Sequence, residues 1–380
     1  MIWTFGDSEA KNTDDVNLGQ YKLTGKFHDD AAAICKLMDI QIHPALRPVL
    51  WEKQKVIEFK DEDEEDKESE EKPLSIIKFD KHRIDKNTIK ALFHILPSSS
   101  VKTLKFCNNG ISPLQFDVLI ERLNATSTIQ TVFFDWNPLY KEDFRKLPKD
   151  EEVFHQRGEE EPSYFARFTA PDSKLKILFL RGDGIIDEDV KQIWENLKTN
   201  HFLKVIDISY NKITKESVEH FKDLTEHNKS IEFIGLAKND LTMADLQPLL
   251  DCIGKQPFPE EEADAHLKKM KERDTIIEKN KKLKASKKPE DPVPLIDDIE
   301  QQEDGQWAIV KNGQIRHLNL CMNPIDDDAK DTILSLLKRT PNDFSITLSG
   351  TQMSKSAVES IWDALSTDEA AELGKQRLLF

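Results

Sequence analysis

The sequence predicts an α/β solenoid in which short strands form a parallel inner sheet and helices cover the outside. An apolar pattern that ends in a polar turn residue, usually Asn, recurs along the chain at steps of about 28 residues. After each copy, apolar residues recur at helical spacing. One strand with one helix cannot bury its own apolar face, so neighbouring units must stack on one another.

Eight copies of the pattern are present. In the second copy the apolar positions and the turn residue are Val101, Leu104, Phe106, Asn109 and Ile111. The turn positions of the eight copies are residues 82, 109, 137, 183, 211, 239, 323 and 351. Five of the intervening steps are about 28 residues long. The longer steps, from position 137 to 183 and from position 239 to 323, indicate insertions after the third and sixth copies.

Each copy predicts one strand followed by one helix. The alternation of apolar and polar residues is typical of a strand with one buried face, and the turn Asn can bond backbone groups as the chain leaves the strand. The helices have buried stripes within residues 89–96, 118–123, 190–197, 218–224, 246–253, 333–337 and 358–365. About eight repeats of about 28 residues therefore form the predicted horseshoe or arc.

The repeats and the segments between them predict the domain organisation. Residues 1–57 form an N-terminal segment and cap, 58–73 an acidic linker, 74–258 repeats one to six with an insertion near 141–172, 259–311 a charged, Lys-rich insertion, 312–366 repeats seven and eight, and 367–380 a C-terminal tail. Terminal units of a solenoid need a cap, and a helix bearing Ala31, Ile34, Cys35 and Met38 can supply one.

The two insertions differ in composition. The first contains Phe154, Tyr164, Phe165 and Phe168, which favour packing against the solenoid or a partner. The second has ten Lys or Arg against three acids between residues 268 and 288 and predicts a projecting, partly helical basic arm. The candidate residues of this arm are Lys268, Lys269, Lys271, Arg273, Lys281, Lys282 and Lys284. We interpret the arm either as a solvated helix or as a surface that attracts acidic partners, such as tubulin surfaces. The acidic linker is either a solvated spacer or a docking site for a basic partner.

Composition excludes several classes of function. The chain of 380 residues has a formal net charge of −16, which argues against nucleic acid as the main partner. No apolar run is long enough for a membrane-spanning helix, and the first residues lack the pattern of a secretory signal, so we expect an intracellular protein that does not bind membranes. The four cysteines lie far apart, which indicates free thiols and no zinc site.

No motif for catalysis or for a cofactor is present. Nucleotide-binding, metalloprotease and hydrolase motifs are missing, and the ten histidines lack the spacing of metal ligands. The acidic triplets at residues 187–189 and 326–328 precede helices, where carboxylates cap free N–H groups. We therefore expect no enzyme, no cofactor and no metal.

The side chains between the buried strand residues should face the concave side and form a binding surface. Aromatic residues are prominent there, and large exposed apolar patches usually mark partner sites. The alternative is that an insertion folds back and covers them. The predicted protein-binding residues are Phe133, Trp136, Phe179, Arg181, Tyr210, Phe233 and Lys238.

The repeat of about 28 residues with a full helix resembles the ribonuclease-inhibitor-like class of leucine-rich repeats, over residues 74–258 and 312–366. The interruption after IEFIGLAKNDLT and the return through EDGQWAIVKNGQIRHLNLCMNPI are similar to the family of leucine-rich repeat-containing protein seventy-one, which is associated with motile cilia. The resemblance implies a structural component of the ciliary or flagellar axoneme, in the cytoplasm and cytoskeleton, with axonemal or microtubule-associated partners.

Two other families share the repeat class. A GTPase-activating protein of the Ran-directed type also has an acidic run, but here the run precedes the repeats, and Arg181 lies in no repeat that matches that family's motif. An actin-filament capping module of the tropomodulin kind would need amphipathic actin-binding helices before its repeats, and these are not evident.

Overall fold

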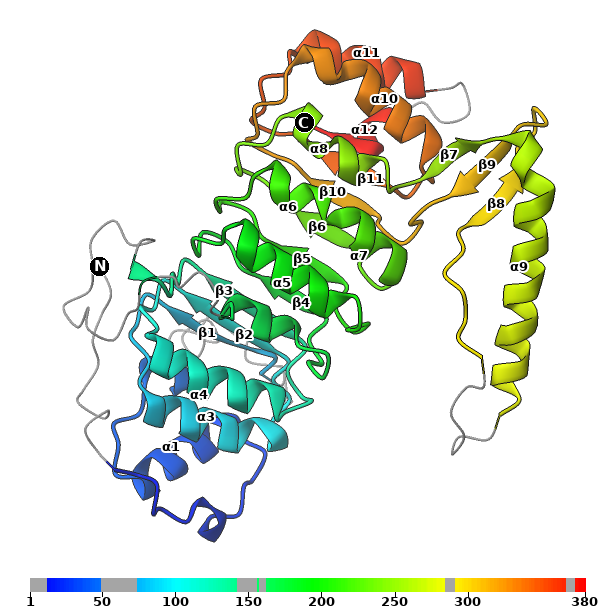
Figure 1. Cartoon of the computed structure of the whole chain (residues 1–380). Helices are drawn as coiled ribbons and strands as arrows, with labels where there is room; N and C mark the ends of the chain where they lie inside the picture. The colour runs from blue at the N-terminus through cyan, green and yellow to red at the C-terminus, as the bar shows by residue number, and fades with distance from the viewer. Residues whose placement is uncertain (1–11, 49–73, 142–155, 157–161, 284–290, 367–372) are drawn as a thin grey trace, which may run out of the picture. The chain divides into compact units, whose positions relative to one another are not determined.

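A computed structural model describes residues 12–48, 74–141, 156, 162–283, 291–366 and 373–380 (Figure 1). The chain divides into two compact units. The N-terminal unit comprises residues 1–161 and 172–184, and the C-terminal unit comprises residues 162–171 and 185–380. In both units parallel strands alternate with helices, as the α/β repeat pattern predicts. The acidic linker 58–73 and Phe154 lie outside the described residues.

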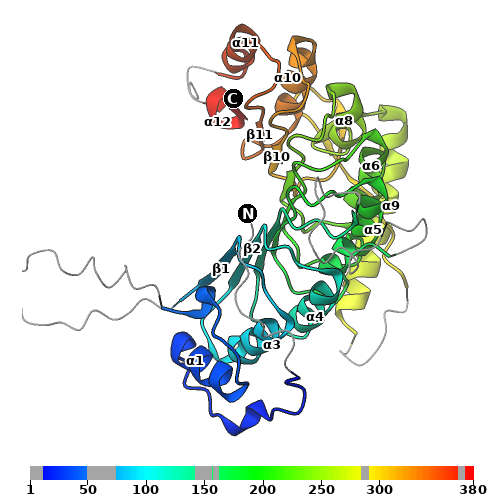
Figure 2. The same ribbon diagram turned by 90° about the vertical axis from the view of Figure 1, so that its left-hand side faces the viewer.

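The N-terminal unit begins with a helix and continues as strand–helix repeats. Its elements are α1 (Phe27–Leu37), β1 (Ile76–Asp80), α3 (Lys86–Ile95), β2 (Thr103–Cys107), α4 (Pro113–Asn124), β3 (Thr131–Asp135) and β4 (Ile177–Phe179). The strands pair in the order β1-β2-β3-β4, and all pairs are parallel. Helices α3 and α4 lie side by side on one face of the sheet (Figure 2). The opposite face is called the open face below.

The C-terminal unit contains the later repeats. They comprise α5 (Asp187–Leu197), β5 (Val205–Asp207), α6 (Lys215–Glu219), α7 (Phe221–His227), β6 (Phe233–Gly235), α8 (Met243–Leu250), β10 (His317–Asn319), α10 (Lys330–Arg339), β11 (Ser345–Thr347) and α11 (Lys355–Leu365). The parallel order is β5-β6-β10-β11, and β12 (Leu378–Leu379) pairs with β11. Within this unit, too, the helices are on one side of the strands (Figure 2).

Buried strand residues and a ladder of turn residues hold the repeats in register. In the N-terminal unit the Asn109 N–H donates to Asn137 Oδ1 at 2.8 Å, and the Asn137 N–H donates to Asp183 Oδ1 at 2.7 Å. In the C-terminal unit the Asn239 N–H donates to Asn323 Oδ1 at 3.1 Å. Because each turn side chain satisfies backbone groups of a neighbouring repeat, the ladder fixes the point at which every strand ends.

The N-terminal helix α1 covers the first repeat. Ala31 and Ile34 are fully buried, and α1 packs on α3. Asp30, also fully buried, accepts hydrogen bonds from the backbone of Thr24 and Gly25. Burial by itself raises the pKa of Asp30, but these hydrogen bonds outweigh it, so the pKa lies below its usual value. The loop before α1 is thereby fastened to the helix.

The aromatic residues of the first insertion pack on a helix of the C-terminal unit. A short 3-10 helix, η7 (Phe165–Thr169), contacts α5, and Phe165 and Phe168 are fully buried. The Asn196 side chain of α5 donates to the Ala166 carbonyl at 2.8 Å. The described part of this insertion therefore fills space beside α5.

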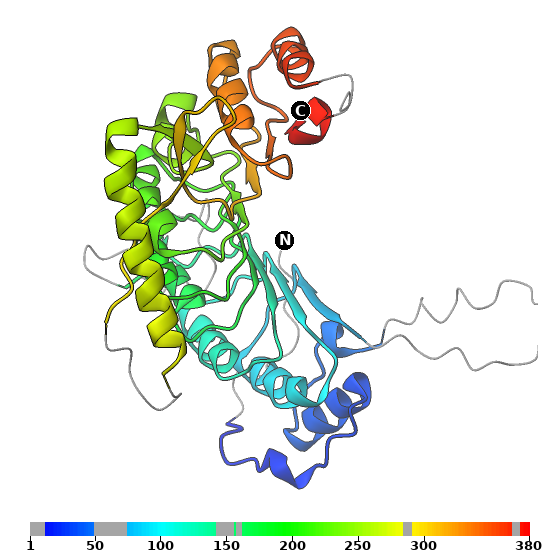
Figure 3. The same cartoon turned by 90° about the vertical axis from the view of Figure 1, so that its right-hand side faces the viewer.

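The second insertion, together with the four residues before its predicted start, forms a sheet that the sequence did not predict. After β7 (Lys255–Phe258) comes the predicted helix, α9 (Glu260–Lys281), and then β8 (Asp298–Gln301) and β9 (Trp307–Val310). The three strands form an antiparallel sheet in the order β7-β9-β8. Figure 3 shows α9 with the chain that returns beside it. None of the helices in the described ranges has the length and apolar content to cross a membrane.

Residues 373–380, which belong to the predicted C-terminal tail, form a helix and a strand. Residues 373–380 contain α12 (Leu373–Arg377) and β12, which extends the parallel sheet beyond β11. Arg377 is only 3% exposed, and its guanidinium donates to the Phe344 and Thr340 carbonyls. Burial lowers the pKa of Arg377, and the two carbonyls supply the acceptors that a buried guanidinium needs. This segment therefore closes the C-terminal end of the core.

Candidate protein-binding faces

The residue before each turn position has a left-handed backbone. These residues, called the turn row below, are Lys81, Asn108, Trp136 and Gly182 in the N-terminal unit and Tyr210, Lys238, Met322 and Gly350 in the C-terminal unit, with φ between +52° and +74°. The backbone N–H of Trp136 donates to the Arg181 carbonyl at 2.8 Å, and that of Tyr210 donates to the Ala237 carbonyl at 2.7 Å. Neighbouring repeats thus impose the same conformation on each turn.

Large apolar side chains are exposed at three positions of the turn row. Trp136 is 47% exposed, Tyr210 39% and Met322 43%. A left-handed conformation costs a residue with a Cβ about 1–2 kcal/mol, which is why Gly or Asn is usual there. Strained residues with exposed apolar side chains are characteristic of functional surfaces. The turn row is therefore the candidate contact surface of each unit.

In the N-terminal unit a glycine makes room for the Trp136 indole. A Cβ atom at Gly182 would lie within 2.6 Å of three carbon atoms of that ring. The indole therefore rests directly on the backbone of the next repeat. The glycine has two functions, because its φ of +71° is also unfavourable for any other residue.

In the C-terminal unit Tyr210 and Met322 approach each other. The Tyr210 hydroxyl donates to Met322 Sδ at 3.1 Å. Lys238 belongs to the repeat between them, and its ammonium lies 3.4 Å from Asp240. A thioether and a phenol together form an adaptable contact surface, since methionine is flexible and polarisable.

The open face of the N-terminal unit has an aromatic pair beside an ion pair. Phe133 and Phe179 are paired in register and stack with their ring centroids 4.3 Å apart. The Arg181 guanidinium lies 5.1 Å from the Phe179 centroid, within cation–π distance. Arg181 also binds Asp135 with two nitrogens, and Nη2 lies 2.7 Å from Oδ2. Asp135 is only 2% exposed, and its carboxylate accepts hydrogen bonds from both the guanidinium and the backbone N–H of Arg181.

The open face of the C-terminal unit has a different pair. Phe233 stacks on His317 at a centroid distance of 5.1 Å. The two ring nitrogens of His317 lie 2.6 Å from Ser345 Oγ and 3.0 Å from Thr347 Oγ1. Burial lowers the pKa of His317, which favours the neutral ring.

The five predicted aromatic residues occupy different positions relative to the turn of their own repeat. Phe133 and Phe179 lie directly opposite each other on neighbouring strands, whereas Phe233 lies opposite Val205 on one side and His317 on the other. Trp136 and Tyr210 belong to the turn row, beyond the strand ends. The alternation within each strand was predicted correctly, but a residue's place along the strand was not considered. Counting back from each turn Asn would have separated the rows and would have added Met322.

The acidic triplets cap helices, as their positions predict. Asp189 accepts from the Ile186 N–H at 3.1 Å within its own helix. Asp187 accepts hydrogen bonds from the backbone and hydroxyls of Thr214 and Ser217, and Asp327 does the same for Ser354 in the last repeat. Throughout the described ranges, no group of three or more His, Cys, Asp or Glu side chains is arranged to hold a metal ion.

The structure divides the predicted basic arm into internal and exposed residues. Lys268, Lys269, Lys271, Lys281 and Lys282 are exposed on or directly after α9. Arg273 is an internal anchor, because its guanidinium binds the Ile296 carbonyl and Asp298, each at a distance near 2.7–2.8 Å. Lys284 lies outside the described residues.

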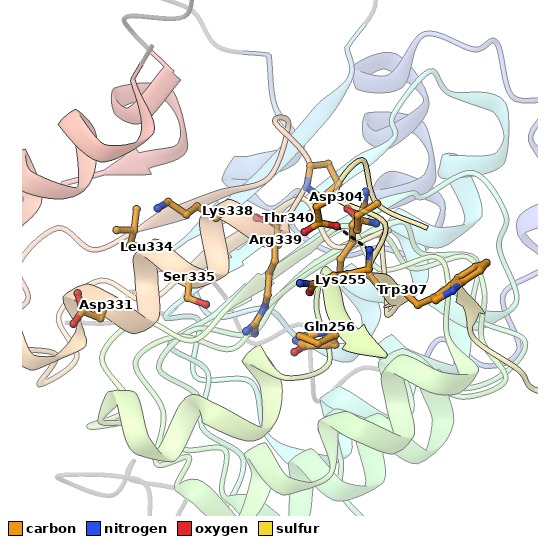
Figure 4. Close-up of a pocket in the computed structure, with 15 residues that line it drawn as sticks. Lys255, Gln256, Asp304, Trp307, Asp331, Leu334, Ser335, Lys338, Arg339 and Thr340 are labelled. Carbon is orange, nitrogen blue, oxygen red and sulfur yellow. Dashed lines mark hydrogen bonds between the residues drawn. The ribbon is translucent and has the colours of Figure 1, made fainter. Parts of the chain in front are cut away.

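A groove of about 790 Å³ lies between the small antiparallel sheet and α10 (Figure 4). Its charged residues are of both signs: Lys255, Lys338 and Arg339 against Asp304 and Asp331. Arg339 is bonded internally, since Nη2 donates to the Leu250 carbonyl at 2.6 Å. The groove therefore presents charges of both signs.

Comparisons with known proteins add little to this geometry. No family model matches the chain, and no curated protein sequence matches it. A tropomodulin C-terminal domain from Caenorhabditis elegans is similar at 10% identity and a TM-score of 0.23, over 44% of this chain and 74% of that one. An internalin from Listeria monocytogenes is similar at 12% identity and a TM-score of 0.21, over 76% of this chain and 84% of that one. The repeats, turn ladder and parallel sheet described above give the chain the architecture of a leucine-rich repeat protein.

Proposed function

We propose that the chain is a non-enzymatic scaffold that binds other proteins through the turn row and the open faces of its sheets. The observation that carries the proposal is the exposure of Trp136, Tyr210 and Met322 at left-handed positions. Aromatic and thioether side chains are frequent anchors of protein interfaces. Because the backbone ladder fixes these positions, the anchors are already ordered before a partner binds, which lowers the entropic cost of association.

Within this function we propose a structural role in the ciliary or flagellar axoneme. The support is the resemblance of the repeat before the second insertion, and of the resumed repeats after it, to a cilia-associated family. The partners would be axonemal or microtubule-associated proteins, and the lysines of α9 would lie near acidic tubulin surfaces. Localisation in the cytoplasm and cytoskeleton, and at the cilium, belongs to the same proposal.

The turn row can be tested with a double variant. Trp136→Ala with Tyr210→Ala should abolish recovery of the main partner from ciliated cells, while the thermal transition of the purified protein stays nearly unchanged. Leu114→Ala with Phe202→Ala is a matched control, since both are large apolar side chains that are exposed outside the turn row. If the double variant recovers the partner as well as the unaltered protein does, the proposed binding surface is wrong. Proximity labelling in ciliated and non-ciliated cells would test the axonemal role.

Two alternative functions share the repeat class. A Ran-directed GTPase-activating protein is favoured only by the repeat class and the acidic run, and Arg181, its candidate arginine, is bound to buried Asp135. Acceleration of GTP hydrolysis by the purified chain would support it. An actin-filament capping module predicts slower elongation of filament ends in a pyrene-actin assay, and unchanged elongation would exclude that role.

A further inference from the structure

One side of α9 is fixed to the returning chain. His266, Arg273 and Asn280 each bond a backbone carbonyl of residues 291–297, at 2.7, 2.7 and 3.0 Å. Their spacing of seven residues is close to two helical turns, so all three side chains are on the same side of the helix. These bonds determine which face of α9 points away from the rest of the insertion.

The opposite side of α9 presents lysines at regular intervals. Four and seven residues on either side of Thr275 are Lys271 and Lys279, and Lys268 and Lys282. This spacing aligns the five residues along one face, about 160° around the helix from Arg273. All five are exposed. We call residues 268–282 on this side the lysine face.

Between residues 268 and 282 there are seven basic and three acidic side chains, and most of the seven basic ones make no ion pair with a described residue. Lys279 is paired with Asp291 at 2.9 Å, and Arg273 is paired with Asp298 at 2.8 Å. Lys268, Lys269, Lys271, Lys281 and Lys282 make no ion pair with any described residue. A local concentration of cations on a chain with a net charge of −16 forms a distinct electrostatic surface.

We propose that the lysine face is a docking site for an acidic segment of a partner protein. The proposal rests on the scaffold function above and specifies the partner's chemistry at a surface separate from the turn row. A segment bearing carboxylates over ~21 Å, the length of helix from Lys268 to Lys282, would match it. Thr275 is at the centre of the face, so a negative charge placed there would oppose binding directly.

Other polyanions fit the same face less well. Glu272 and Glu278 flank it and would repel the dense phosphates of a nucleic acid, and none of its residues is an aromatic on which a base could stack. A membrane surface would need apolar side chains among the lysines to enter the lipid, and the face has none. An acidic polypeptide can instead place its carboxylates between the flanking glutamates.

The test uses the full chain and a fluorescent peptide made only of glutamate, long enough to span the face. Anisotropy should show saturable binding that disappears as salt is raised to ~0.5 M, since exposed ion pairs are screened. The triple variant Lys268→Gln, Lys271→Gln, Lys282→Gln should weaken binding by ~10-fold or more. Thr275→Glu should weaken it several-fold, whereas Thr275→Gln should not. Far-UV circular dichroism checks that α9 is retained, since glutamine keeps good helix propensity.

The controls separate this proposal from general charge effects. Lys86→Gln, Lys102→Gln, Lys176→Gln removes three exposed lysines elsewhere and should bind the peptide normally. Equal weakening by both triple variants would overturn the proposal, and so would tighter binding of a single-stranded oligonucleotide or anionic vesicles to the same lysines. The peptide needs neither Trp136 nor Tyr210. Failure of peptide binding would therefore leave the proposed function intact, and loss of partner recovery in the Trp136 and Tyr210 variant would leave peptide binding intact.

Discussion

Substitution of Gly182 by alanine should displace the Trp136 indole and destabilise the N-terminal unit. Two costs add. The backbone at φ +71° is unfavourable for alanine by ~1–2 kcal/mol. The new methyl group would also lie within 2.6 Å of three indole carbons, and forcing a side chain out of such a site costs ~1–3 kcal/mol. The expected loss in the free energy of unfolding is therefore ~2–5 kcal/mol.

A double-mutant cycle isolates the contribution of the indole. In a Trp136→Ala background, Gly182→Ala should cost only the backbone term of ~1–2 kcal/mol, which leaves a coupling of ~1–3 kcal/mol. Urea denaturation followed by circular dichroism measures all four proteins without relying on tryptophan fluorescence. Gly350→Ala is a matched control with φ +74°, because its Cβ would be 3.1 Å from the flexible Met322 side chain. If Gly182→Ala is equally costly with and without the indole, the reasoning about this contact is refuted.

Three further predictions concern stability and reactivity. Burial and nearby His82 lower the pKa of His43 from 6.5 to about 4. The free energy of unfolding should therefore fall by ~3 kcal/mol as the pH falls from 6.5 towards 4, and then level off. Denaturant titrations of His43→Gln should show no such dependence on pH. Asn323→Ala removes the acceptor for the backbone N–H groups of Asn239 and Leu241, so it should lower the free energy of unfolding by ~2–4 kcal/mol, as measured by thermal unfolding. A loss below ~1 kcal/mol would contradict the role given to the turn ladder. Burial and Asp85 raise the pKa of Cys35 to about 11, so its alkylation by iodoacetamide at neutral pH should be slower than that of an unfolded control, and equal rates would contradict the burial.

The repeat architecture could be predicted because every repeat buries its apolar residues and bonds its turn to the next repeat in the same way. A turn Asn such as Asn137 or Asn239 must satisfy backbone groups of the neighbouring repeat, so the spacing of about 28 residues between turn positions records the size of the unit directly. The apolar positions of strands and helices follow for the same reason. A partly helical arm was also predicted, because charged residues and a weak apolar stripe run through this segment, although α9 begins at Glu260, before the basic residues.

The missed features depend on contacts between distant residues. The small sheet joins Gln256 to Ile309, and its strands of four residues have no clear pattern within a charged insertion. Arg377 is charged and near the chain's last residue, which suggests exposure, yet carbonyls of Phe344 and Thr340 make its burial possible. The burial of Asp135 likewise required Arg181 from a repeat 46 residues away.

The second insertion leaves the neighbouring repeats undisturbed, and this has a practical consequence. Strands β6 and β10 pair as direct neighbours although a long excursion of the chain separates them, and Ile253 and Asn312 form an isolated bridge where the chain departs and returns. The two ends of the excursion are therefore adjacent. Removing residues 255–310 and joining the ends with a short glycine-containing linker should leave a foldable array, and a different small domain could be grafted at the same junction.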